Sequence, residues 1–244
     1  MPLLTPARQR GIEILDDPAT PAQIRERSMA DLALSNALFG GRRVAMHALR
    51  PVITTLPSRA LLLDVGTGLA DIPSRAAREA ATLGKRLTTI GIDTADSLMR
   101  RASQRLTGGA LVANALRLPL SDRSVDVVLC SQLLHHFEER DAVRLIAELH
   151  RVTRRYVVVC DLQRSWFAAA GWWLASRALH FHKVSQRDGV TSVMRGFTVE
   201  ELRSLVLRGA GVEPIVRRGL FWRLSATWRK DQTRGGRSDS TDAR

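Results

Sequence analysis

The segment LLLDVGTGLADIP, residues 61–73, constrains the fold of this chain more than any other stretch. A short apolar run ends in Asp64, two glycines follow, and Asp71 stands where a helix is expected to begin. A strand, a glycine turn and a helix in this order form the entrance to a nucleotide site in Rossmann-like folds. Gly66 and Gly68 would let the backbone approach a ligand without a Cβ clash.

Short apolar runs alternate with helical patterns from about residue 59. We expect buried strands in ALLLDV, RLTTIGID, GALVAN, SVDVVLCS and RYVVVCDL, and helices in IPSRAAREAATLG, ADSLMRRASQRL and EERDAVRLIAELHRVTR. Continuous apolar strands separated by helices are typical of parallel sheets that are covered on both faces. The fold class predicted from this alternation is therefore α/β.

Three helices are expected before the first strand. They lie in TPARQRGIEILDD, TPAQIRERSMADLALSNALFG and GGRRVAMHALRPVI, where apolar residues recur at helical spacing. Thr20 before Pro21 is a candidate N-cap, with proline at the first helical position. We interpret residues 1–57 as an N-terminal helical lid.

The strand–helix alternation breaks after the fifth expected strand. Residues 162–197 form an insertion that we interpret as a substrate cap. A helix is expected next, with Thr198 and Glu201 as a capping box. VEPIVRRG and LFWRLSATWRK then predict an antiparallel hairpin around Gly219. Residues 58–228 are thus expected to form the main domain, and the polar residues 229–244 a disordered tail.

The composition fits one α/β domain. The chain has 244 residues, 45% of them hydrophobic, and no apolar run long enough to cross a membrane. The formal net charge is +13, but the basic residues are spread along the chain, which favours a solvated surface over a nucleic-acid site. Cys130 and Cys160 stand in apolar runs and are expected to be reduced core residues. With no signal peptide recognisable at the N-terminus, we expect a cytoplasmic protein.

The charges around the glycine turn indicate what kind of nucleotide it binds. Asp71 stands where dinucleotide-binding proteins have a third glycine, and a carboxylate there would repel a pyrophosphate. Together with Asp64 it would instead favour a cationic ligand without phosphate, such as S-adenosylmethionine. Asp93, at the end of the second strand, is expected to accept the ribose hydroxyls. Asn114 and Ala115, after the third strand, are expected at the adenine edge.

Four motifs, DVGTGLA, GID, ANALRLPL and SVDVVLCSQLLHHF, resemble those of class I S-adenosylmethionine-dependent methyltransferases. The chain is similar to the small-molecule branch that includes the ubiquinone and menaquinone C-methyltransferases. This resemblance covers about residues 61–161. It implies a Rossmann-like seven-stranded sheet, mostly parallel with an antiparallel last strand, and helices on both faces. The cofactor residues expected from the motifs are Asp64, Gly66, Thr67, Gly68, Asp71, Asp93, Thr94, Asn114, Ala115 and Ser131.

The sequence departs from the family pattern at three places. Ala70 replaces the third glycine of the motif, Asn114 replaces an acid, and RVTRRYVVV replaces a Pro-Gly-Gly turn before the fifth strand. That last segment, with DLQRS and RDGVTSVMRGFT, resembles a narrower group of methyltransferases encoded beside type III polyketide synthases. This narrower resemblance implies methylation of phenolic or pyrone lipids.

Two histidines are candidates for a general base that deprotonates the methyl acceptor. His135 and His136 follow the fourth strand, at the edge where open α/β sheets bind ligands, and the sequence does not distinguish between them. His180 and His182 in the insertion are weaker candidates, because positions two apart lie on different helix faces. His47 and His150 are expected at the surface, and no acid or third ligand has the spacing of a metal site.

The segment WFAAAGWWLASRAL, residues 166–179, is apolar nearly all round, which predicts burial against the core or against a lipid-like substrate. Phe167, Trp172 and Trp173 would form an apolar wall of the substrate site, with Gln132 near the acceptor. The segment is too short to span a bilayer, although peripheral contact with a membrane interface fits its composition.

The predicted function is transfer of a methyl group from S-adenosylmethionine to a small, apolar phenolic, polyketide or quinone-like acceptor, at oxygen or carbon. Two alternatives stay open: an RNA methyltransferase, and a non-catalytic cofactor-binding partner subunit of the same fold. A dehydrogenase ranks last because of Asp71. The sequence leaves open the identity of the acceptor, the choice between oxygen and carbon, and the oligomeric state.

Overall fold

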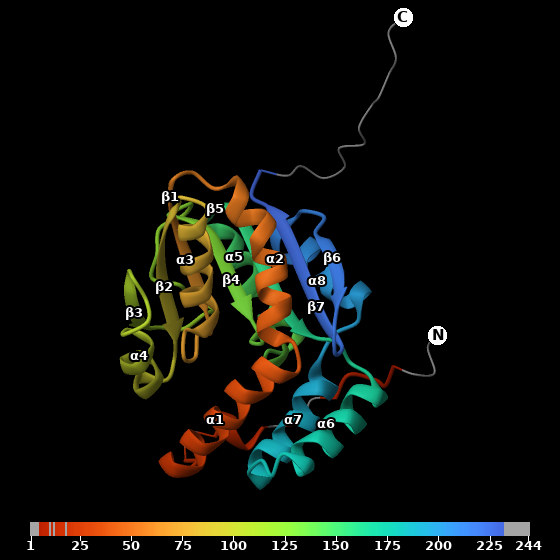
Figure 1. Cartoon of the computed structure of the whole chain (residues 1–244). Coiled ribbons are helices and arrows are strands. Elements are labelled where there is room, and N and C mark those ends of the chain that lie inside the picture. Colours follow the sequence, from red (N-terminus) through yellow and green to blue (C-terminus); the bar gives the residue numbers. More distant parts are fainter. Residues whose placement is uncertain (1–4, 10, 12, 18, 232–244) are drawn as a thin grey trace, which may run out of the picture.

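A computed structural model describes residues 5–9, 11, 13–17 and 19–231 of the chain. It contains one seven-stranded sheet with the order β3-β2-β1-β4-β5-β7-β6 (Figure 1). The strands are β1 (Arg59–Val65), β2 (Arg86–Asp93), β3 (Gly109–Val112), β4 (Val125–Ser131), β5 (Thr153–Leu162), β6 (Ile215–Gly219) and β7 (Arg223–Arg229). The first five pair in parallel, and β7 is antiparallel to both β5 and β6. The predicted fold class is confirmed.

Helices cover both faces of the sheet. On one face lie α2 (Gly41–Thr55) and α3 (Asp71–Thr82), and on the other α5 (Glu139–Val152) and α8 (Val199–Ala210) (Figure 1). The short α4 (Asp96–Ala102) lies by β2 and β3. Each face buries its own apolar cluster, the larger of which contains Trp228 and Phe197. Burial on both faces explains why the central strands are continuous apolar runs.

Three helices extend beyond the carboxyl ends of the parallel strands: α1 (Ala22–Leu38), α6 (Trp166–Ala178) and α7 (Lys183–Arg195) (Figure 1). α6 packs along α7, and α7 contacts α1. We name these three helices the cap. The predicted capping box of α8 is confirmed, since Thr198 Oγ1 accepts from the N–H of Glu201 and Glu201 Oε2 accepts from the N–H of Thr198. The last residues of the predicted tail, 232–244, lie outside the described residues.

The prediction of a helix in residues 5–17 is wrong. Among its described residues only Ile14–Asp16 form a single 3-10 turn, η2. The N–H groups of Ile14 and Leu15 donate to the carboxylate of Asp188 on α7, and that of Gln9 donates to the carbonyl of Met194. Some backbone N–H groups of this segment therefore donate hydrogen bonds to α7 and not to carbonyls within a helix of their own.

Two predictions about the cap helices are also wrong. Thr20 does not cap α1; its hydroxyl donates to the carbonyl of Ile14, and Pro21 is the N-cap residue. α6 is largely exposed instead of buried, because only Ala169 and Ser176 of its residues are buried. Composition alone could not show that Trp166, Phe167, Trp173 and Leu174 of this helix are exposed. No helix in the described part of the chain is long and apolar enough to cross a membrane.

The contact between α6 and α7 depends on a glycine. A Cβ on Gly189 of α7 would lie 2.0 Å from Cε2 of Trp172 on α6, whereas a Cβ on Gly171 would meet nothing within 4 Å. Trp172 also donates its indole N–H to the carbonyl of Gln186. The close approach of the two helices thus requires the absence of a side chain at position 189.

We predict that Gly189→Ala lowers the free energy of unfolding by about 1–3 kcal/mol, because Trp172 must move. Gly171→Ala is the matched control, and it should leave stability unchanged or raise it by up to ~1 kcal/mol, as expected for an open helical position. Chemical denaturation measures both. Equal stability of the two variants would contradict the packing described here.

Candidate active site

The glycine turn after β1 is held by the neighbouring strand. The N–H groups of Gly66 and Thr67 both donate to the carbonyl of Ile92, at 2.8 and 3.1 Å. Gly66 has φ +74°, and a Cβ there would lie 2.9 Å from Leu133 Cδ2. Gly68, with φ +52°, would meet nothing within 4 Å. The backbone at Gly68 is therefore open to a ligand, while Gly66 is required by packing.

Asp64 is a buried carboxylate beneath this turn. Its Oδ2 accepts from the hydroxyl of Thr67 at 2.8 Å, and its Oδ1 has no hydrogen-bond partner among the described residues. Burial raises the pKa of Asp64 to about 7; the bond from Thr67 opposes this, and the charges of Asp71 and Asp93 add to it. An unpaired, buried acid of this kind is stabilised by a cationic ligand.

Asp93 links the turn to the end of β2. One oxygen accepts from the N–H of Gly68 at 3.1 Å, and the other from the N–H of Ala95 at 3.2 Å. Each carboxylate oxygen can accept a further bond, so Asp93 retains the capacity to bind a pair of hydroxyls.

A second site lies beside the glycine turn, at the carboxyl ends of β4 and β5 and beneath the cap. It is a cavity of about 210 Å³. The residues that line it are Glu13, Leu15, Ser28, Leu32, Ser35, Gln132, His135, His136, Leu162, Trp172, Ser185, Asp188, Gly189, Ser192, Val193 and Arg223. From α1 the cavity receives Ser28, Leu32 and Ser35; the two serines are buried, whereas Leu34 and Leu38 on the same helix are exposed.

His135 and Asp161 form a buried pair in this cavity. His135 lies on η3 (Leu134–His136), and its Nδ1 is 2.6 Å from Oδ1 of Asp161 in β5. The backbone N–H of His135 donates to the other carboxylate oxygen at 3.1 Å. Burial tends to raise the pKa of Asp161, but the charge and hydrogen bond of His135, the N–H of Leu162 and the charge of His136 hold it below its ordinary value. Because an ionised carboxylate can only accept, Nδ1 carries the proton and Nε2 is left as a base.

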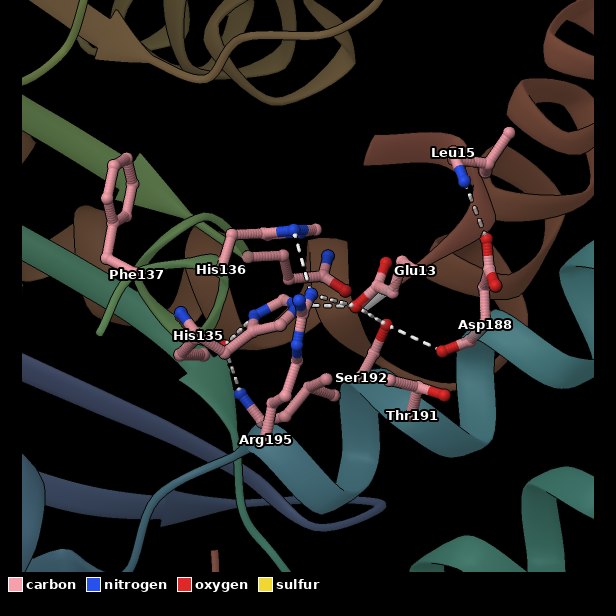
Figure 2. Close-up of polar contacts among 12 residues, drawn as sticks. Glu13, Leu15, His135, His136, Phe137, Asp188, Thr191, Ser192 and Arg195 are labelled. Carbon is pink, nitrogen blue, oxygen red and sulfur yellow. Dashed lines mark hydrogen bonds and ion pairs between the residues drawn. The ribbon is translucent and has the colours of Figure 1, made fainter. Parts of the chain in front are cut away.

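Glu13 lines the cavity next to this pair, and Arg195 holds it in place (Figure 2). Glu13 Oε1 lies 3.9 Å from His135 Nε2, accepts from Ser192 at 2.7 Å and pairs with Arg195 at 2.9 Å. Arg195 Nη1 also lies 3.4 Å from Nδ1 of His136. Because 3.9 Å is too long for a hydrogen bond, Glu13 does not take up the lone pair of His135 Nε2.

Buried polar atoms without a partner concentrate at these two sites. Within the described part of the chain, four of the six lie there, and the other two are on Ser124 and Arg203. The four are Ser28 Oγ, Asp64 Oδ1, Ser131 Oγ and Arg223 Nε. Each such atom costs about 1–3 kcal/mol when nothing pairs with it, so this concentration points to ligands that supply the partners.

One family model matches the central part of the chain. Residues 63–159 match the family model described as "Methyltransferase domain". The match spans the glycine turn, Asp93, the two histidines and most of β5. This part of the chain is therefore similar to methyltransferase domains. No curated protein sequence matches the chain significantly.

Solved methyltransferase structures share the fold of this chain. A SAM-dependent methyltransferase from Aquifex aeolicus superposes with a TM-score of 0.58 at 17% identity, covering 84% of this chain and 97% of that one. The magnesium protoporphyrin IX methyltransferase of Synechocystis PCC 6803 with bound SAM superposes with a TM-score of 0.53 at 12% sequence identity, and the match covers 88% of each chain. The plantazolicin methyltransferase BamL superposes with a TM-score of 0.59 at 13% sequence identity, and the match covers 84% of this chain and 74% of that one.

The residues of the glycine turn fit the cofactor of a methyltransferase. The free Oδ1 of Asp64 suits a cation, the open backbone at Gly68 suits close approach, and Asp93 suits a ribose. Asp71 begins α3, and Ser131 ends β4 with its hydroxyl buried. Thr94 and Asn114 are exposed, Ala115 is buried, and Oδ1 of Asn114 accepts from the N–H of Leu116. The assignment of these side chains to the cofactor stays a prediction.

The predicted substrate residues do not all meet at the cavity. Gln132 and Trp172 line it; Gln132 donates to Asn36 and accepts from Arg223, both at 2.7 Å. Phe167 and Trp173 are about half exposed and are not among the lining residues.

The other histidines lie outside the cavity. His182 caps α7, His180 is exposed in the turn before it, and His47 is exposed as expected. The surface prediction for His150 is wrong, because it is partly buried and its Nδ1 lies 3.2 Å from Nε1 of Trp228. Burial, with the charges of Lys230 and Arg123, lowers the pKa of His150 to about 4.

Sequence reasoning missed four residues at or next to the cavity: Glu13, Asp161, Arg195 and Arg223. Only Asp161 carried a usable signal, as an acid at the end of an apolar strand. Glu13, His135 and His136 bring three potential metal-ligand atoms within 4.8 Å, which sequence spacing did not reveal. The guanidinium of Arg195 already supplies a cation to Glu13 and His136, so this arrangement disfavours a metal ion.

The pKa of Asp64 predicts a stability change with pH. The pKa is about 7 in the folded protein against 3.8 in the unfolded chain, so the folded state binds the extra proton between these values. Stability should therefore fall as the pH rises from about 4 to 7, by at most roughly 4 kcal/mol. Asp64→Asn should remove this loss, because the amide cannot ionise and can still accept from Thr67.

Urea denaturation of the cofactor-free protein at about pH 5 and pH 8 measures the effect. Asp64→Asn should gain more stability at the higher pH, whereas Asp96→Asn, an exposed acid paired with Arg100, should not. An equal effect of Asp64→Asn at both values would show that this carboxylate is already ionised below neutral pH.

Proposed function

We propose that the protein transfers the methyl group of S-adenosylmethionine to a small, apolar phenolic, polyketide or quinone-like acceptor bound in the cavity under the cap. The observation that carries the proposal is the His135–Asp161 pair, buried in the cavity wall beside the glycine turn. The cavity, at about 210 Å³, matches a single ring system rather than a folded nucleic acid. The free and buried Cys130 and Cys160 support a reducing compartment, and we infer a cytoplasmic location.

His135 is the proposed general base. Asp161 fixes its tautomer and orientation, so that Nε2 can take the proton of an acceptor hydroxyl. The resulting phenolate is nucleophilic at oxygen and at ring carbon, so the same base serves either outcome. Bound S-adenosylmethionine would supply the methyl group from its sulfonium, and the neutral thioether S-adenosylhomocysteine would leave without the help of an acid.

Arg223 is the proposed partner of the phenolate. Burial lowers the pKa of this guanidinium to about 10, although Asp161 and Cys160 oppose the shift, and its Nε is an unpaired donor in the described structure. It remains charged at neutral pH and would stabilise a developing anion. The cap would contribute to catalysis by keeping water away from the reacting atoms.

The strongly basic composition keeps an RNA methyltransferase as the alternative. Against it, the catalytic pair lies under three helices, whereas a base in RNA would need an open, charged trench. A non-catalytic partner subunit would have no use for a buried His–Asp pair, because such a pair costs desolvation energy.

The test is transfer of labelled methyl from S-adenosylmethionine to a panel of alkylphenols and hydroxyquinones, with transfer RNA as the competing acceptor. We expect phenolic products. His135→Gln and Asp161→Asn should each lower kcat by about 10²-fold or more and leave S-adenosylhomocysteine affinity within about twofold.

His136→Gln is the matched control, because its ring lies 4.3 Å from that of His135, whereas His135 is the histidine whose Nδ1 bonds Asp161. The His136→Gln variant should lose less kcat than His135→Gln. Its rate should still fall at acid pH, as in the parent protein, whereas His135→Gln should remove this fall. Methylation of transfer RNA without phenolic product, or an unchanged kcat in His135→Gln, would contradict the proposal.

A further inference from the structure

The cap presents an unusual aromatic surface to solvent. On α6, Trp166, Phe167, Trp173 and Leu174 are each more than half exposed. The turn between β6 and β7 adds Leu220, Phe221 and Trp222, each at least 40% exposed. We name these seven residues the aromatic surface. Large apolar side chains exposed together in this way mark a contact with a partner or a membrane.

The turn holds its aromatic side chains outward at a conformational cost. Phe221 and Trp222 have φ values of +55° and +53°, a region that bulky L-residues rarely adopt. Strain of this kind persists where the surrounding structure imposes it, and it is commonest at functional sites.

An apolar cavity of about 250 Å³ connects the two parts of the aromatic surface. Ala168, Gly171 and Trp172 of α6 line one side, and Phe221 and Trp222 line the other. Phe39, also in its wall, makes edge contacts with both Trp172 and Phe221, at centroid distances of 6.0 and 6.2 Å. α6 and the turn therefore form one continuous surface.

The charge around this surface has a single sign. Between residues 162 and 198 the only acid is Asp188, which is buried against η2, and between 214 and 230 there is none. The exposed charged residues of α6, α7 and β6 are Arg177, Lys183, Arg187, Arg217 and Arg218, whereas Arg229 and Lys230 lie at the far end of β7 from the turn. Arg177 stacks on the ring of Trp173 at 4.0 Å, so a cation is fixed within the aromatic surface.

We propose that the aromatic surface docks on a lipid bilayer that carries anionic headgroups. Tryptophan and phenylalanine beside basic residues suit the membrane–water interface, and surrounding arginines and lysines suit its negative charge. A symmetric contact with a second copy is disfavoured, because it would bring together two surfaces whose exposed charges on α6, α7 and β6 are all positive.

The docked orientation has a consequence for the reaction, which rests on the proposed function. The apolar cavity shares Leu162, Trp172, Val193 and Arg223 with the cavity that contains His135. An apolar acceptor could thus pass from the lipid phase between α6 and the turn to the base without crossing water. Membrane binding itself requires neither acceptor nor cofactor, so its failure would leave the proposed function standing.

The test is cosedimentation of the full chain with sucrose-loaded vesicles of phosphatidylcholine alone or with about 30% phosphatidylglycerol. We expect binding to the anionic vesicles that weakens at high salt, and a blue shift of tryptophan fluorescence. The triple variant Trp166→Ser, Trp173→Ser, Leu174→Ser should bind at least tenfold more weakly. Arg177→Gln with Lys183→Gln should lose roughly fivefold for each charge on anionic vesicles only.

Leu83→Ser with Leu111→Ser is the matched control, because these leucines are 48% and 43% exposed but lie at the end of α3 and on β3. It should bind like the parent, and thermal unfolding verifies that all variants fold. Absence of binding to anionic vesicles would overturn the proposal. So would a dimer in solution that the aromatic triple variant dissociates, since a second copy would then cover the surface.

Discussion

The parallel register of β2, β1, β4 and β5 brings the ends of four strands together at one edge of the sheet. Asp64 in β1 pairs with Gly91 and Leu129, and Leu129 pairs with Val158, so the four strands end within a few residues of one another. Each strand then ends in a polar group: Asp64, Asp93, Ser131 and Asp161. Because the apolar runs are buried on both faces, these groups cannot shift by a residue without moving core side chains into the wrong layer. Hydrophobic packing thus fixes the geometry of the site.

The two parts of that edge suit ligands of opposite charge. Around the glycine turn, burial and, to a smaller extent, the charges of Asp71 and Asp93 raise the pKa of Asp64, which makes a cationic ligand favourable. Under the cap, Arg195 and Arg223 accompany His135 and Glu13, which suits an acceptor that becomes an anion. A positively charged methyl donor and a negatively charged acceptor would therefore each be stabilised on its own side of the reacting centre.

Sequence reasoning succeeded where the signal is local or periodic. The strands, the helices beside the sheet and the capping box follow from apolar runs and short spacings, and the glycine turn follows from its own residues. It failed where distant segments meet. Glu13 and Arg195 are 182 residues apart, and no local rule pairs them. The first segment was predicted helical because its spacing allows a helix, but Asp188 takes its N–H groups instead. α6 is apolar on every side, so its pattern contained no information about which face is exposed.

The central claim is that the buried carboxylate of Asp64, beside an open glycine turn, favours a positively charged, phosphate-free nucleoside. Calorimetric titration with S-adenosylmethionine near pH 7, in buffers of different ionisation enthalpy, tests it directly, because a bound sulfonium cation should favour the ionised form of Asp64 and so release its proton. We expect release of about half a proton per molecule bound, absent in Asp64→Asn, and no binding of NAD. Binding without proton release, or binding of NAD in preference, would contradict the account.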